Sequence, residues 1–461
     1  MSAARKTVAG ELGRYVAQIE YEQIPETVID KAKEVLLDQL GCMLIGSTLE
    51  WNKIVYNFVV ANEGKGGCAI INYGDRMVAD YAAYVNGTFG QGAELDDYVD
   101  RSGGHPGSQC IPVAMALGEK DHIDGKAFLT AVVAGFDVSY HVGGGMLPSL
   151  LQKGFHPQSV FGVFAAAAVA GRLLKLDDEK MMYALSIAGS HASGTMEFDQ
   201  TGGEVKRLHT GMAVRGGMQA AILAKMGLTA PPTIFEGKRG ILPLYAGEKG
   251  NAEAIIKDLG QEYGVMHSCF KQYPTVNALQ SSIDVMSELV VKHKIRAADV
   301  ERIDVGVTET TLMHGASIVE PKDTISASFS LAFSLAIRIL KGSNDLSLYM
   351  DENVRNDPEV LKLARKVHPY AVPEEAKDTR FASRIKVTLA GGKSVEGSED
   401  YPKGSVKNPN TQAERYEKFR RLGSSVLSGR RMDQVIQTVE NVEQLKDISS
   451  LVSLLVREPT N

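Results

Sequence analysis

Acidic side chains and a histidine follow one another in the glycine-rich segment GAELDDYVDRSGGHPGS. Its ionisable residues are Glu94, Asp96, Asp97, Asp100, Arg101 and His105. Adjacent carboxylates followed by a histidine could supply a general base and a group that orients it. A solvated acidic loop explains the pattern about equally well, because the spacing matches no set of metal ligands.

Two further segments place histidines and cations at the start of predicted helices. In KGFHPQS, His156 precedes Pro157. A helix N-terminus disfavours the charged imidazole and suits a neutral base or hydrogen-bond donor, although structural capping is an equal alternative. In GGEVKRLHTG, Lys206, Arg207 and His209 open the next predicted helix. Such a turn suits an anion, for example a substrate carboxylate, and a solvated basic turn is the alternative.

The fourth segment, HSCFKQYPT, contains His267, Lys271 and Tyr273 at a predicted junction between two domains. Domain junctions are favoured places for ligand clefts, although Lys271 could equally be surface charge. No G-x-G-x-x-G, P-loop, G-x-S-x-G or H-E-x-x-H motif occurs, and the four cysteines form no C-x-x-C pair. The motifs therefore predict acid–base chemistry on an acidic substrate, with no metal and no cofactor.

Composition limits the partners of this chain. It has 461 residues, 44% of them hydrophobic, and a formal net charge of −6. That length favours two domains, and a pI near 6.0 argues against binding nucleic acid. The longest apolar stretch, residues 161–170, is shorter than the ~20 residues that cross a bilayer. We expect a cytoplasmic protein with a small partner, no nucleic acid and no membrane.

Helical periodicity dominates the first half of the chain. Apolar residues recur at helical spacing from Pro25 to Gly41. Further helices are predicted at residues 81–91, 112–119, 125–142, 160–174, 179–191 and 210–225. Their alanines and glycines predict closely packed helices. No strand is expected before about residue 250.

Strand-like alternation begins in the second half. Apolar and polar residues alternate over 303–307 and 385–389, and Gly391 with Gly392 predicts a hairpin turn. Predicted helices over 277–293 and 326–340 make this region a smaller α+β domain. Charged amphipathic helices at 412–422, 429–439 and 442–455 could pack back on the first half.

Taken together, these segments resemble the MmgE/PrpD family, whose members include 2-methylcitrate dehydratase, cis-aconitate decarboxylase and iminodisuccinate epimerase. The similarity covers nearly the whole chain. Besides the acidic segment, it includes LLDQLG, GFHPQSVFG, KRLHTGMAVRGGMQAAILAKMGLTAPPTIFEGKRG, FKQYP, PKDTISASFSLAFSLA and YPKGSVKNPN. Several ordered motifs are more specific than any single one.

The resemblance implies a mostly α fold with an α+β part. A large all-helical domain would be formed by both chain ends, residues 1–265 and 404–461, with a smaller α+β lid domain inserted at 266–403. It also implies a homodimer, and chemistry without metal or cofactor in the cleft between the domains, next to a carboxylate of a small acid.

Residue by residue, the resemblance and the segments above predict two groups of site residues. The predicted catalytic group is Asp96, His105, His156 and Lys206. The predicted substrate-binding group is Glu94, Asp97, Tyr98, Arg207, His209, Lys271, Tyr273 and Gln280.

The chain departs from the family pattern at several of these places. Tyr98 stands where cis-aconitate decarboxylase has a threonine, and Phe333 replaces a tyrosine. Val276 and Gln280 stand where many members have a cysteine and a histidine. The lid side thus lacks two candidate proton donors.

The hypothesis is removal of a proton alpha to a carboxylate, with His105 or His156 as base and Lys206 binding the carboxylate. Loss of a β-hydroxyl would make a 2-methylcitrate-type dehydratase, which ranks first. Protonation on the opposite face would make an epimerase or isomerase, and loss of CO2 a decarboxylase. A non-catalytic carboxylate-binding protein is the alternative from another class.

Overall fold

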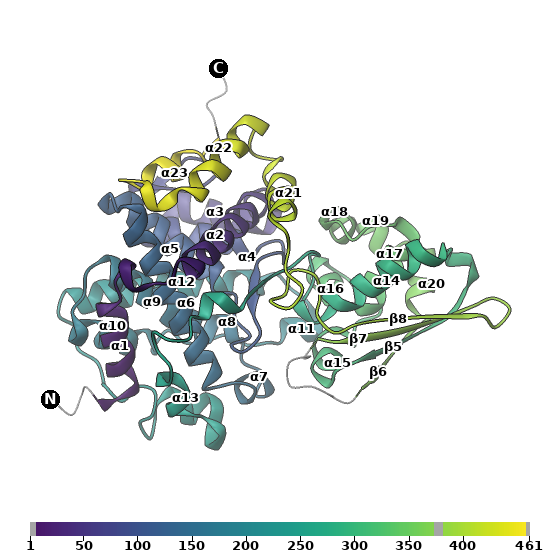
Figure 1. Cartoon of the computed structure of the whole chain (residues 1–461), viewed down its shortest axis with the longest axis horizontal. Coiled ribbons are helices and arrows are strands. Elements are labelled where there is room, and N and C mark those ends of the chain that lie inside the picture. Colours follow the sequence, from purple (N-terminus) through teal and green to yellow (C-terminus); the bar gives the residue numbers. More distant parts are fainter. Residues whose placement is uncertain (1–5, 373–380, 458–461) are drawn as a thin grey trace. The chain divides into compact units, whose positions relative to one another are not determined.

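A computed structural model describes residues 6–372 and 381–457, which divide into two compact units (Figure 1). Unit 1 contains Met1–Met196, Lys206–Cys269 and Thr411–Asn461. Unit 2 contains Glu197–Val205 and Phe270–Asn410. The described part is mostly helical with one small mixed sheet, so the predicted fold class is confirmed.

Unit 1 is built from helices. They are α1 (Val8–Gln18), α2 (Glu26–Gly46), α3 (Glu50–Asn62), α4 (Ala79–Gln91), α5 (Gly107–Asp121), α6 (Gly125–Gly144), α7 (Ser149–Gln152), α8 (Pro157–Val160), α9 (Gly162–Leu173), α10 (Asp178–Ala188), α12 (Val205–Lys225), α13 (Ala252–Ile256), α21 (Gln412–Gly423), α22 (Gly429–Glu440) and α23 (Ser449–Ser453). Helices α6 and α9 pack at its centre, where a side chain at Gly135 would collide with Val169 and Cys110. Small residues there permit the close helix packing that the sequence predicted.

Short strands also occur in this first part of the chain. They are β1 (Lys65–Ala69), β2 (Arg76–Met77) and β3 (Asp97–Val99), followed by β4 (Ser268–Phe270). The expectation of no strand before about residue 250 was therefore wrong. These strands are too short to show alternation, and Gly66 lies so close to the Met77 backbone that a side chain would not fit.

Unit 2 combines a sheet with helices. Its strands are β5 (Val300–Val307), β6 (Val367–Ala371), β7 (Ser383–Leu389) and β8 (Ser394–Glu399), in the order β6-β5-β7-β8. Its helices are α11 (Phe198–Thr201), α14 (Gln280–His293), α15 (Glu309–Gly315), α16 (Thr324–Ser328), α17 (Leu331–Lys341), α18 (Leu346–Met350), α19 (Glu352–Arg355) and α20 (Pro358–Ala364). Apolar residues of α14, α17 and α20 share a core with the sheet. Gly391 and Gly392 both have positive φ in the β7–β8 turn, as predicted.

Several predicted helix boundaries were wrong. Helix α5 begins at Gly107 and contains Pro112, which the sequence placed in a first turn. The helix predicted over 326–340 is two helices, because the Ser330 side chain caps α17 by accepting from the Phe333 N–H. Residues 442–455 form a 3-10 turn and the short α23.

No helix within residues 6–372 and 381–457 has the length and apolar character needed to cross a membrane.

Candidate active site

The acidic segment is a buried loop between α4 and α5 in unit 1. The side chains of Glu94, Asp96 and Asp97 are at most 1% exposed. The alternative of a solvated acidic loop is therefore wrong for these three carboxyls. Burying a carboxyl group costs free energy unless the group gains hydrogen bonds or a charge partner. The partners of these three carboxyls therefore determine which chemistry the loop can support.

His105 is held through one ring nitrogen. Its Nδ1 lies 2.8 Å from the Asp97 carbonyl oxygen and 3.2 Å from the Asp96 carboxylate. A carbonyl oxygen can only accept a hydrogen bond, so Nδ1 carries the hydrogen and Nε2 carries the lone pair of the neutral ring. This arrangement orients an imidazole for proton transfer through Nε2.

Asp97 joins the loop to the start of α5. Its carboxyl oxygens accept the Gly107 N–H at 3.1 and 3.3 Å. Burial raises the pKa of Asp97 well above its ordinary value, and the nearby Asp96 and Asp38 raise it further. The protonated form of Asp97 is therefore more favoured than that of an exposed aspartate.

Gln158, which was not among the predicted site residues, connects the two predicted histidine segments. Its amide oxygen accepts a hydrogen bond of 2.7 Å from the backbone N–H of His105. Its amide nitrogen donates to Ser108 at 2.7 Å and to Thr210 at 3.2 Å. The only signal in the sequence is its place in the HPQS motif. Gln158 thereby links the loop that carries His105 to α12.

His156 and His209 form a buried pair, with their Nδ1 atoms 3.0 Å apart. Burial and Lys206 lower the pKa of His209 to about 4. Burial, His209, Lys206 and His105 hold the pKa of His156 well below its ordinary value. Both rings are neutral near pH 7, so one Nδ1–H donates to the other ring's lone pair. The pair suits hydrogen bonding better than proton abstraction.

The first turn of α12 separates its two cations. The Lys206 ammonium forms a buried ion pair with Glu94. The Arg207 guanidinium lies over the Trp51 ring, 4.1 Å from its centroid. The Trp51 indole N–H in turn donates to the Gly92 carbonyl at 3.1 Å. The predicted anion site therefore has Lys206 beside a carboxylate and Arg207 packed against an aromatic ring.

A lysine from the C-terminal segment also reaches the loop. The Lys418 ammonium of α21 lies 2.6 Å from the Asp38 carboxylate and donates to the Leu95 carbonyl at 2.8 Å. Lys418 is only 4% exposed. Its partners are hundreds of residues away in the chain, and the surrounding sequence is an ordinary charged helix, so no local pattern could identify it.

The end of the loop is held by a network that includes His267. Arg101 donates to the Tyr140 hydroxyl at 3.0 Å and to Glu262 at 3.1 Å. His267 lies 3.3 Å from the other oxygen of Glu262 and stacks on Tyr140. Tyr98 is buried within β3. His267 therefore belongs to a structural clamp on the loop.

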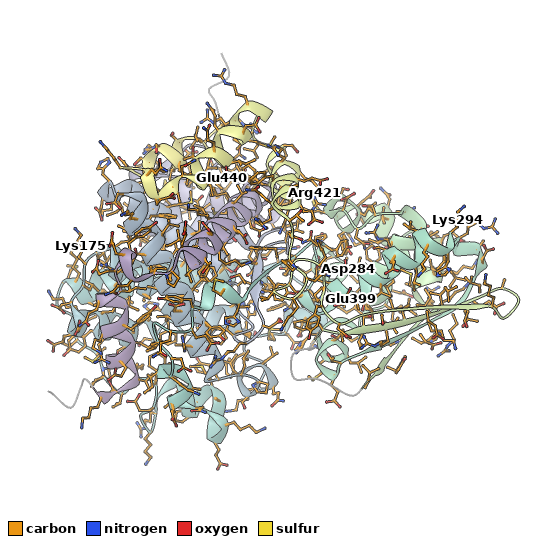
Figure 2. All side chains as sticks on the ribbon, viewed as in Figure 1. Lys175, Asp284, Lys294, Glu399, Arg421 and Glu440 are labelled. Carbon is orange, nitrogen blue, oxygen red and sulfur yellow. The ribbon has the colours of Figure 1, made fainter. Side chains whose placement is uncertain are left out.

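Three predicted site residues lie in unit 2. Lys271 is 1% exposed. The Tyr273 hydroxyl donates to Asp284, which Figure 2 labels, at 2.8 Å. The Gln280 amide oxygen accepts the Gln272 and Tyr273 N–H groups at 2.9 and 3.2 Å. Its amide nitrogen donates to the Tyr273 carbonyl at 3.0 Å and to the Thr275 hydroxyl at 2.8 Å. Gln280 thus holds the turn that carries Tyr273.

Among the residues described, no three histidine, cysteine or carboxylate side chains are grouped in a way that could hold a metal ion.

Comparison with known proteins agrees with the resemblance. The MmgE/PrpD N-terminal domain matches residues 10–254, and the MmgE/PrpD C-terminal domain matches residues 273–444. A cis-aconitate decarboxylase-like protein, oryM, of Aspergillus oryzae is 28% identical over 478 residues, covering 99% of both chains. Cis-aconitate decarboxylase of Aspergillus terreus is 28% identical, covering 98% of this chain and 97% of its own. The human cis-aconitate decarboxylase is 26% identical, covering 98% and 95%. This chain belongs to the MmgE/PrpD family.

Proposed function

We propose that this protein is a lyase that acts on a small di- or tricarboxylate and that His105 transfers the proton. The observation that carries the proposal is the orientation of His105, whose Nδ1 faces the Asp96 carboxylate and the Asp97 carbonyl. A histidine fixed through Nδ1 by a carboxylate presents Nε2 to a substrate as base or, when protonated, as acid. His156 is the weaker candidate, because its pKa is lowered and it pairs with His209.

Decarboxylation of an unsaturated acid such as cis-aconitate is the reaction we favour. Three relatives of nearly full length carry that activity or a likeness to it in their names. The reaction breaks the bond from carbon to one carboxylate, releases CO2, and leaves an electron pair that takes one proton. Protonated His105 would deliver that proton from Nε2, so one oriented imidazole suffices.

Dehydration of a hydroxy acid is the second candidate. It requires a base for the alpha proton and an acid for the departing hydroxide. His105 would be the base. Asp97 favours this reaction, because burial raises the pKa of its carboxyl and so favours the protonated acid in the loop that carries His105.

Lys206 supplies the positive charge in either reaction. Its ammonium is buried with Glu94, where a charge acts more strongly than in water. A substrate carboxylate beside Lys206 would make a second contact with the same ammonium. Charge that develops on the substrate in the transition state would be stabilised there.

Proton NMR in D2O with EDTA tests the proposal, using cis-aconitate, citrate, 2-methylcitrate and a chiral aminodicarboxylate in separate incubations. We expect cis-aconitate to lose CO2 and gain deuterium at carbon. New vinyl signals from a hydroxy acid would instead identify a dehydratase, and exchange without net reaction an epimerase or isomerase. Silence with every acid, together with saturable binding of one of them, would identify a carboxylate-binding protein.

His105→Gln should reduce turnover by about 10²-fold or more while the fold is kept. His122→Gln is the matched control. His122 Nδ1 also faces a carboxylate, that of Asp447 at 2.7 Å, but its side chain is exposed. Full turnover in His105→Gln would exclude His105 as the proton-transfer group.

We also propose a cellular compartment and an oligomeric state for this protein. All four cysteines are buried thiols, which suits a reducing compartment such as the cytoplasm. A homodimer is expected from the family resemblance, and light scattering coupled to size-exclusion chromatography would measure it.

A further inference from the structure

Lys418 is a buried cation on a helix that the proposed chemistry does not otherwise use. It lies in the middle of α21, in the C-terminal segment, and its ammonium contacts Asp38 of α2 and the Leu95 carbonyl of the acidic loop. A lysine with 4% exposure is costly to bury unless its ammonium is fully engaged. Two oxygens at 2.6 and 2.8 Å provide that engagement.

The hydrogen bond from Lys418 to the Leu95 carbonyl lies next to two residues of the proposed active site. Leu95 stands between Glu94, the partner of Lys206, and Asp96, the partner of His105. A hydrogen bond to its carbonyl fixes the peptide that leads directly into Asp96. The charged donor makes this bond stronger than a bond between neutral groups.

The charges around the loop also indicate that Lys418 stabilises the loop. Asp96 lies close enough to raise the pKa of Asp38, and Asp96 and Asp38 both raise the pKa of Asp97. The Lys418 ammonium lowers the pKa values of both Asp38 and Asp97. Without this ammonium, buried like charges would repel one another at the base of the loop.

We propose that Lys418 is a positioning residue of the active site, which acts through the Leu95 carbonyl and Asp96 to hold His105 in its Nδ1–H form. This inference rests on the proposed function for its catalytic consequence. The effect on the His105 ring is separate and can be observed without any substrate.

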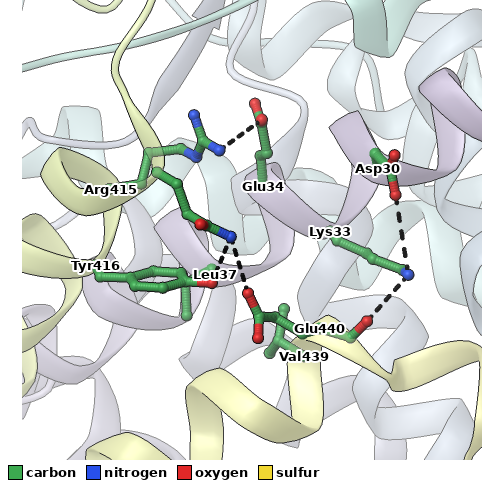
Figure 3. A pocket seen from close by; sticks show the side chains of 9 residues that line it. Asp30, Lys33, Glu34, Leu37, Arg415, Tyr416, Val439 and Glu440 are labelled. Atoms are coloured by element: carbon green, nitrogen blue, oxygen red, sulfur yellow. Dashed lines mark hydrogen bonds and ion pairs between the residues drawn. The ribbon is translucent and has the colours of Figure 1, made fainter.

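Lys33 offers a matched control, because it joins the same parts of the chain in the same way. Its ammonium also connects α2 to the C-terminal segment, through the Glu440 carbonyl at 3.0 Å (Figure 3). It also lies 2.8 Å from the Glu443 carboxylate. It lines a cavity of about 330 Å³ between α2, α21 and α22. Its ammonium contacts Asp30, Glu440 and Glu443, which all lie outside the acidic loop.

The experiment compares Lys418→Met, Lys418→Arg and Lys33→Met in the full chain. Nitrogen-15 NMR of labelled histidine reports which ring nitrogen of His105 carries the hydrogen, with His105→Gln used to assign the signals. We expect the Nδ1–H form in the wild type and in Lys33→Met. In Lys418→Met we expect a mixture of the two forms, and Lys418→Arg should restore part of the Nδ1–H signal.

Turnover provides the second readout. We expect kcat of Lys418→Met to fall by about tenfold to a hundredfold with KM nearly unchanged, because the displaced group acts on the reacting atoms. A lower kcat with an unchanged His105 tautomer would overturn the positioning role. An altered tautomer in an enzyme that is inactive on every acid would support the role and count against the proposed reaction.

Lys418→Met alone leaves Asp38 buried without its partner and could therefore fail to fold. The double variant Asp38→Asn/Lys418→Met removes both charges while still lacking the donor to Leu95. It should fold and show the same mixture of His105 forms. A folded double variant that keeps the pure Nδ1–H form would contradict the proposal.

Discussion

Burial determines which ionisable side chains of unit 1 carry charge. Asp97 and Asp137 are at most 1% exposed, and burial is the first cause of the raised pKa of each. Burial likewise lowers the pKa values of His156 and His209. The buried groups thus tend towards their neutral forms.

Asp137 gives this effect a measurable pH dependence. It accepts hydrogen bonds from Tyr15 and the Gly264 N–H, and burial raises its pKa to about 7. Between about pH 4 and pH 7 the Asp137 carboxyl is ionised in the unfolded chain but still protonated in the native protein. The free energy of unfolding therefore falls as the pH rises through this range, and Asp137 causes no further change above about pH 7. Asp137→Asn should therefore gain thermal stability relative to wild type as pH rises over this range, by at most about 4 kcal/mol.

Melting curves from pH 4.5 to 8.5 would measure the difference. The exposed Asp121→Asn serves as the control for removing a carboxylate charge. A difference between Asp137→Asn and wild type that stays constant with pH would contradict the assignment.

The Asp96 carboxylate should matter more to turnover than to folding. Asp96→Asn removes the charge beside His105 Nδ1, and its amide can donate to that nitrogen and favour the wrong tautomer. We expect kcat to fall by about 10²-fold. Asp447→Asn removes the same kind of partner from the exposed His122 and should leave kcat unchanged. Equal kinetics for the two variants would exclude an orienting role for Asp96.

At the scale of elements, three helix starts supply the site. Helix α5 begins two residues after His105, α8 begins directly after His156, and α12 begins with the turn that holds Lys206. Gln158 and Asp97 join these starts by hydrogen bonds. Because the N–H groups of a helix's first turn lack partners within the helix, such ends attract acceptors and anions.

A substitution at Gly107 would test the contact between α5 and the acidic loop. A side chain there would collide with the Asp97 carboxyl, whereas alanine is otherwise the better helix former by about 1 kcal/mol. Gly107→Ala should therefore lower both the melting temperature and kcat. Gly429 is also the first residue of its helix, with nothing within 4 Å of an added side chain, so Gly429→Ala should be neutral or stabilising. Wild-type behaviour of Gly107→Ala would show that the loop tolerates displacement.

At the scale of the whole molecule, unit 1 depends on residues from both ends of the chain. The yellow C-terminal helices of Figure 1 pack on helices from the first 121 residues, α21 and α22 on α2 and α23 on α5. Their buried apolar side chains include Phe419, Leu422, Val435, Val439 and Leu451. The C-terminal segment is therefore part of the core.

Deleting residues 411–461 should abolish cooperative unfolding of unit 1. Each buried apolar side chain contributes about 1.5–3 kcal/mol, so five of them rival the 5–15 kcal/mol by which a typical domain is stable. Circular dichroism during heating would measure the transition. A truncated chain that melts cooperatively at the wild-type temperature would show that the segment is dispensable.

Local pattern was enough to predict much of the fold. The helical spacing from Pro25, the alternation in β5 and β7 and the glycine pair at 391–392 all correspond to elements of the structure. Patterns failed where a short element depends on distant residues. Strand β2 has two residues, and α16 ends where a serine side chain caps the next helix.

The sequence by itself determined most of the longer helices and strands and that His156 and Lys206 stand beside helix starts, because periodicity and capping act over a few residues. Only the tertiary structure decided the partners: Asp96 for His105, Glu94 for Lys206, and Leu95 for Lys418. Those contacts set protonation and orientation. They depend on burial and on groups far apart in the chain, which no local pattern encodes.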